Sequence, residues 1–169
     1  MPVVVFFSHN GETLLDGRHQ QVSFGNTEVV AKLISQKVNA EVSQLVPVLP
    51  YPIDYQATLT RSKAELEKHQ FPEFEPLKVD FRKEDEIFIG FPVWWGTLPM
   101  IVQHFLMATD LNSKIIYPFC THEGSGFGRS KQELQRLLPA TAQLQTGLAV
   151  RGSRVTCAQC AVNNWLGQR

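Results

Sequence analysis

The chain has 169 residues, and its 16 Lys and Arg are balanced by 16 Asp and Glu. This length fits one domain with a sizeable apolar core, so we expect a single domain over residues 1–169. Neutral charge gives no reason to expect nucleic acid as a partner. The longest apolar runs are far shorter than the ~20 residues of a membrane span, so we expect no membrane contact.

Short β-branched runs alternate along the chain with amphipathic segments. Strands are predicted over residues 3–7, 41–46, 86–91, 114–119 and 142–145, and helices over residues 27–38, 55–69, 99–109, 130–138 and 156–166. The strands are apolar at nearly every position, as in parallel strands that helices cover on both faces. The pattern predicts an α/β fold with a doubly wound parallel sheet, whose ligand cleft lies at the carboxyl ends of the strands.

Two segments interrupt this alternation. Residues 70–83 contain Pro72 and Pro76, which forbid a regular helix, and we interpret them as a solvated loop. Residues 9–25 form a longer interruption between the first strand and the first helix. Connections of more than about 12–15 residues are usually functional or mobile in compact domains, so this segment is a candidate for function.

The loop after the first strand suits a phosphate group. It begins with Ser8 and Asn10, and the chain enters the first helix through Gly25, Asn26 and Thr27. Hydroxyls and free N–H groups at a helix N-terminus bind an anion without Lys or Arg. An ordinary N-cap at Asn26 and an ordinary turn at Asn10 would also account for this pattern.

The loop after the third strand is the most specific segment. It runs through Pro92, Val93, Trp94, Trp95 and Gly96. Adjacent residues in a loop point different ways, so one indole can fill the core edge while the other presents a flat face to a planar ligand. Glycine lets the backbone approach that ligand. The alternative is that both indoles pack against neighbouring helices.

The loop after the fourth strand is dense in glycine and leads into a helix. Its candidate residues are Thr121, His122, Glu123, Gly124, Ser125 and Gly126. Such a loop can offer N–H groups to the polar edge of a ligand, although a purely structural turn would look the same. The segment lacks the glycine spacing of dinucleotide folds, the ending of a P-loop and the nucleophile elbow of hydrolases.

Together with residues 50–55 and 147–153, these three loops resemble a bacterial flavodoxin-like family over nearly the whole chain. The resemblance implies a three-layer α/β/α fold with a five-stranded parallel sheet of order 2-1-3-4-5, and FMN as the cofactor. It assigns the FMN phosphate to the first loop and the flavin ring to the space between the other two. In ordinary flavodoxins the phosphate loop is contiguous, whereas residues 13–24 divide it here.

Cysteine usage and the start of the chain indicate the compartment. Three cysteines, an odd number, favour reduced thiols, and no basic segment with an apolar signal core opens the chain, so we expect a cytoplasmic protein. Cys157 and Cys160 have redox spacing, but no further ligands lie nearby, so we expect no metal.

FMN chemistry leaves three functions open. The protein could carry electrons to a redox partner protein, which requires a charged docking face. It could instead be a reductase that passes electrons from NAD(P)H to quinones or similar small-molecule acceptors. The third alternative is a non-redox module that binds an anion or nucleotide. Residues 13–24 could wall an acceptor pocket or form a homodimer contact, and His122 could relay a proton or contribute only its backbone.

Overall fold

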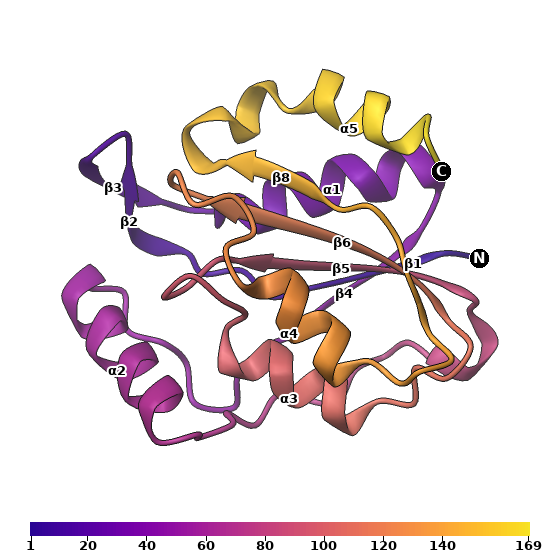
Figure 1. The fold of residues 1–169 in the computed structure, drawn as a ribbon. Coiled ribbons are helices and arrows are strands. Elements are labelled where there is room, and N and C mark those ends of the chain that lie inside the picture. Colours follow the sequence, from indigo (N-terminus) through magenta and orange to yellow (C-terminus); the bar gives the residue numbers. More distant parts are fainter.

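A parallel sheet lies at the centre of the computed structural model, which describes all 169 residues (Figure 1). Its strands are β1 (Val3–Phe6), β4 (Glu41–Gln44), β5 (Glu86–Pro92), β6 (Ile115–His122), β7 (Gln143–Leu144) and β8 (Leu148–Arg151). The order is β4-β1-β5-β6, and both β7 and β8 pair with β6. This confirms the predicted 2-1-3-4-5 order, with the fifth position shared by two short strands.

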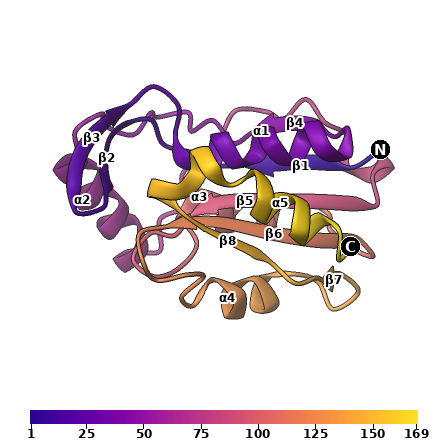
Figure 2. The ribbon, with the colours of Figure 1, turned by 90° about the horizontal axis from the view of Figure 1, so that it is seen from above.

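Helices cover both faces of the sheet. In Figures 1 and 2, α1 (Asn26–Val38) and α5 (Gln159–Leu166) lie on one face, and α3 (Met100–Ala108) and α4 (Ser130–Leu137) lie on the other. The α2 helix (Tyr55–Glu67) stands at the cleft end of the molecule and contacts α3 and β2. The predicted three-layer α/β/α fold is confirmed.

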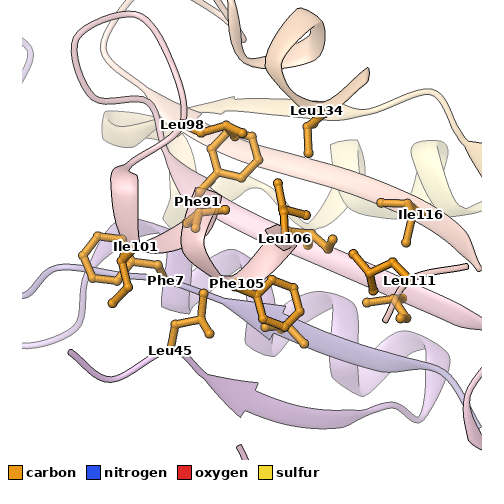
Figure 3. Packing of buried hydrophobic residues seen from close by; sticks show 14 of the residues in the cluster. Phe7, Leu45, Phe91, Leu98, Ile101, Phe105, Leu106, Leu111, Ile116 and Leu134 are labelled. Carbon is orange, nitrogen blue, oxygen red and sulfur yellow. The ribbon is translucent and has the colours of Figure 1, made fainter. Parts of the chain in front are cut away.

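The core has two parts because successive strand residues point to opposite faces. Val3, Val5 and Phe7 belong to the cluster under α3 and α4, which Figure 3 shows around Phe105. Val4 and its even-numbered neighbour Phe6 belong to the cluster under α1 and α5. Since both faces are buried, the strands read as continuous apolar runs in the sequence.

The segment predicted as an insertion is a β-hairpin. Strands β2 (Gly11–Leu15) and β3 (Arg18–Val22) pair in antiparallel register. The turn between them has φ 49° at Asp16 and 76° at Gly17, as in a type I′ hairpin turn. In Figures 1 and 2 the hairpin lies at the carboxyl ends of the parallel strands, opposite both chain termini. The segment that divides the phosphate loop is therefore a β-hairpin of defined register.

Three further features of the structure differ from the sequence prediction. β8 was not predicted, and the last helix begins as the 3₁₀ helix η2 (Gly152–Cys157) before α5. Residues 70–83 are largely irregular, but they are not solvated throughout. Phe74 packs against the core and Phe81 is buried in the 3₁₀ helix η1 (Phe81–Lys83), because their rings cover the cluster beside α3. No helix has the length and apolarity that a membrane span requires.

Candidate functional site

A cleft of about 250 Å³ lies at the carboxyl ends of β1, β5 and β6. Each of the three predicted loops contributes to its lining, and the hairpin and α2 contribute as well. The lining residues are Ser8, His9, Glu12, Thr13, Leu14, Asn26, Thr27, Tyr55, Thr58, Leu59, Ser62, Pro92, Val93, Trp94, Trp95, Thr121, His122 and Glu123. This is the switch point between β1 and β5, where a doubly wound sheet binds its ligand.

The N-terminus of α1 forms one end of the cleft. The Ser8 hydroxyl accepts a hydrogen bond from the Glu28 N–H at 3.1 Å. The cap residue is Gly25, which gives no side-chain hydrogen bond to the first turn. A Cβ atom added at Gly25 would lie 2.1 Å from Ser8 Oγ, so only glycine allows this close approach. The free first-turn N–H groups and the nearby hydroxyls fit a phosphate.

The hydroxyls of Thr27 and Thr121 connect the first loop to the third. Their oxygens lie 2.8 Å apart, and both residues are buried. Residues that are distant in sequence are thereby held at fixed positions beside the α1 N-terminus. The contact joins the first turn of α1 to the carboxyl end of β6.

The two tryptophans occupy different environments. Trp94 and Thr97 exchange two backbone hydrogen bonds, and φ is 54° at Trp95 and 72° at Gly96, so Trp95 occupies a tight hairpin-like turn. The Trp94 ring packs edge-on against Phe7, with ring centroids 5.2 Å apart. Trp95 is 40% exposed, and its Nε1 donates to Ser62 Oγ at 3.0 Å. Trp94 therefore packs inward, whereas Trp95 stands at the mouth of the cleft.

A bulky residue with positive φ is uncommon, because its Cβ is crowded by the backbone. At Trp95 the surrounding structure holds this conformation, through the Trp94–Thr97 pairing and the hydrogen bond to Ser62. Such backbone strain is concentrated at ligand sites. The turn therefore positions an exposed indole at the cleft.

The third loop supplies a histidine and a glutamate. His122 Nδ1 accepts a hydrogen bond from the Gly124 N–H at 2.9 Å, which orients the ring. Burial lowers the pKa of His122 and favours its uncharged form. Glu123 Oε1 is buried against Gly152, and burial raises the pKa of this carboxyl group.

The structure brings together most of the predicted residues. Those that line the cleft are Ser8, Asn26, Thr27, Pro92, Val93, Trp94, Trp95, Thr121, His122 and Glu123. Those outside its lining are Asn10, Gly25, Gly96, Gly124, Ser125 and Gly126. Two of the latter shape the loops, since Gly25 lies against Ser8 and the Gly96 carbonyl accepts from the Arg129 N–H at 2.7 Å.

No sequence pattern predicts a binding role for α2 or the strands of the hairpin, although residues 13–24 are a candidate wall of an acceptor pocket. The lining includes Tyr55, Thr58, Leu59 and Ser62 from α2, and Glu12, Thr13 and Leu14 from β2. The Asp-Gly turn between two short runs is a sequence signal for the hairpin. No local signal places α2 beside the cleft, because this position depends on contacts between distant segments.

The fold and the cleft define a class, that of doubly wound α/β proteins that bind a ligand at the switch point of the sheet. The model of the flavodoxin family matches residues 20–168, so the chain belongs to the flavodoxin family. Flavodoxins bind FMN at this switch point, and FMN is therefore the cofactor of the chain, as predicted.

Solved structures agree on the fold. A proposed flavoprotein from Bacteroides eggerthii is 24% identical with a TM-score of 0.78, and the match covers 98% of this chain and 95% of that one. A flavoprotein from Lactobacillus acidophilus in complex with FMN is 19% identical with a TM-score of 0.67, covering 92% and 96%. Oxidised flavodoxin 2 from Bacillus cereus is 15% identical with a TM-score of 0.53, covering 100% of both chains. Among curated protein sequences, none matches significantly.

Proposed function

We propose that this flavodoxin transfers electrons through FMN bound in the cleft at the carboxyl ends of β1, β5 and β6. The observation that carries the proposal is the convergence of the three loops on that cleft, with an anion-binding helix terminus at one end and an exposed indole at its mouth. When bound, FMN supplies the redox chemistry, accepting a hydride or single electrons.

The protein's own residues bind and orient the cofactor in this proposal. Ser8, Asn26 and Thr27 hold the phosphate at the α1 N-terminus, where no cationic side chain is needed. Trp95 stacks on the flavin ring, because its indole is the exposed one of the pair. Thr121 to Glu123 border the polar edge of the ring. The L. acidophilus protein, which shares the fold, is in complex with FMN.

The electron acceptor in our proposal is a small molecule, so the protein acts as a reductase. A carrier that docks by charge needs a face of one sign. Around this cleft the charges are mixed, since Arg151 lies 3.7 Å from Asp16 and Lys63 lies beside Trp95. In addition, the hairpin and α2 wall the cleft, which suits a small ligand better than a partner protein. Carriage to a redox partner protein is the second candidate.

The visible spectrum of the purified protein, followed by release and identification of the flavin, tests FMN binding. Steady oxidation of NAD(P)H with a quinone present would support the reductase. Electron transfer only to a partner protein would support the carrier. A colourless protein that takes up no added FMN would contradict both and favour a non-redox binding module.

We also propose that the protein works in the cytoplasm. All three cysteines are free thiols, and Cys157 and Cys160 are exposed. Exposed, unpaired thiols are typical of a reducing compartment. Fractionation of the source cells, followed by detection of the protein, tests this assignment.

A further inference from the structure

The β2–β3 hairpin is fixed across the mouth of the cleft, and we call residues 11–22 the strap. One side of the strap is attached to the start of α2. The Glu12 N–H donates to the Ile53 carbonyl at 2.9 Å, and Glu12 Oε2 accepts from the Tyr55 N–H at 2.9 Å. His19, on the other strand of the hairpin, places its Nδ1 3.1 Å from Glu12 Oε1, and its ring lies edge to face against Tyr55 with centroids 4.7 Å apart. Glu12 is therefore held in one position in the wall of the cleft.

The tip of the strap is attached to the opposite side. The Asp16 N–H lies 3.4 Å from Glu123 Oε2, and the Asp16 carboxylate lies 3.7 Å from the Arg151 guanidinium. Contacts at both ends make the strap a wall of the site. Its residues Glu12, Thr13 and Leu14 line the cleft.

The lining of the cleft carries negative charge and no cationic side chain. It contains the carboxyl groups of Glu12 and Glu123, and neither Lys nor Arg is among its residues. Burial lowers the pKa of both His9 and His122, which favours their uncharged forms. The phosphate of FMN adds a further negative charge. An anionic group placed inside the cleft would therefore meet repulsion with no Lys or Arg in the lining to compensate it, whereas the dihydronicotinamide ring of NAD(P)H is itself uncharged.

The cationic side chains near the cleft either pair with a carboxylate or lie outside its lining. Arg151 pairs with Asp16, and Lys63 lies 3.8 Å from Glu67. The Arg129 guanidinium lies 3.5 Å from the Trp95 carbonyl, on the third loop outside the lining. None of these groups forms an anion site within the cleft. The rest of its lining is uncharged, with hydroxyl-bearing side chains such as Thr58 and Ser62 beside apolar ones such as Leu14 and Leu59.

We infer that the cleft admits uncharged planar acceptors, such as quinones without acidic groups, and excludes anionic ones, with Glu12 on the strap as the selecting residue. This inference rests on the proposed function. The quinone gains two electrons and two protons and becomes the hydroquinone, while reduced FMN becomes oxidised FMN. Tyr55 offers a flat surface for such a ring, and the fixed carboxylate of Glu12 sets the charge preference.

The test compares menadione, which is uncharged, with a naphthoquinone sulfonate. The FMN-loaded protein is reduced with dithionite, and its reoxidation by each quinone is followed in a stopped-flow instrument at about pH 8, where ordinary imidazoles are uncharged. Each rate is divided by that of reduced riboflavin, which corrects for the intrinsic reactivity of the quinone. Binding of each quinone to the oxidised holoprotein, measured by quenching of tryptophan fluorescence, gives a readout independent of turnover.

The informative variant is Glu12→Gln, because the amide oxygen can still accept from the Tyr55 N–H while the charge is lost. Glu133→Gln is the matched control, because Glu133 is a half-buried carboxylate on α4 that accepts from Arg136 and does not line the cleft. We expect the wild type to favour menadione about tenfold in corrected rate and in affinity. Glu12→Gln should raise the rate and affinity for the sulfonate about threefold or more relative to those for menadione. The control should change neither.

Two results would overturn the inference, and they are distinguishable. A protein that takes up no FMN would overturn the proposed function and the inference with it. A protein that binds and reduces FMN normally, but treats both quinones alike or is insensitive to Glu12→Gln, would overturn the charge selectivity alone.

Discussion

Replacing each tryptophan separately by alanine distinguishes the roles assigned to Trp94 and Trp95. The Trp94 ring packs against Phe7 and Tyr51, with centroid distances of 5.2 and 5.0 Å. Trp95 is 40% exposed and makes one side-chain hydrogen bond, to Ser62. Trp95→Ala should therefore act mainly on cofactor binding, whereas Trp94→Ala should act mainly on folding.

Trp95→Ala should affect FMN binding more than apoprotein stability, and Trp94→Ala should affect stability more than binding. Stacking of an aromatic side chain on a planar base is worth about 1–3 kcal/mol, so Trp95→Ala should weaken FMN binding about five- to 150-fold. Its effect on the apoprotein should be about 1 kcal/mol, the net value of the lost hydrogen bond to Ser62. Removing the inward-packed Trp94 ring should cost the apoprotein about 3 kcal/mol of unfolding free energy.

Flavin fluorescence titration measures the FMN dissociation constant, and urea unfolding of the apoprotein measures stability. Phe71→Ala is the matched control, because Phe71 is 39% exposed but does not line the cleft. It should leave FMN affinity unchanged. Wild-type FMN affinity in Trp95→Ala would refute the stacking role. A stable Trp94→Ala apoprotein with weakened FMN binding would show that the roles of the two indoles are reversed.

Three further predictions concern single groups. Thr27→Ala should weaken FMN binding about tenfold and riboflavin binding little, because only FMN carries the phosphate; equal losses in two titrations would move the phosphate elsewhere. Burial raises the pKa of Cys120 to about 12, so a thiol reagent should modify only the two exposed cysteines before unfolding and all three afterwards. The hydrogen bond from the Tyr55 N–H lowers the pKa of Glu12 below its ordinary 4.5, so this anchor of the strap is fully formed above pH 4.5 and is lost as the pH falls through the lowered pKa. The NMR shift of the Tyr55 amide should follow that transition in the wild type, and a pH-dependent shift that persists in Glu12→Gln would contradict it.

The sheet and most of the cleft could be predicted from the sequence because both depend on local patterns. A strand such as β5 is apolar throughout, and that pattern arises only where helices cover both faces. Once the strand order is known, the loops that follow β1, β5 and β6 must meet at the switch point. Thr27 and Thr121 are 94 positions apart in sequence, yet their hydroxyls lie 2.8 Å apart for this reason.

The remaining part of the site could not be predicted, because it depends on contacts that the local sequence does not encode. Which indole faces outward depends on the packing of Trp94 against Phe7 and on the left-handed backbone at Trp95. The hairpin had a local signal in Asp16 and Gly17, but its position across the cleft depends on Glu12 reaching the first turn of α2. β8 is short, and its Arg151 lies 3.7 Å from Asp16 of the strap, a tertiary contact that the local sequence does not encode.

The parts of the site that local sequence patterns predict differ in their proposed role from the parts that depend on tertiary contacts. In our proposal, the residues that hold the phosphate and the flavin ring lie on the loops after the parallel strands, which the family fold positions directly. The residues proposed to meet the acceptor lie on the strap and on α2, which tertiary contacts such as that of Glu12 with Tyr55 hold in place. Changes to the strap can therefore alter the choice of acceptor without altering the phosphate site at Ser8 and Thr27. For the same reason, acceptor preference is expected to depend more on the strap than on the flavodoxin loops.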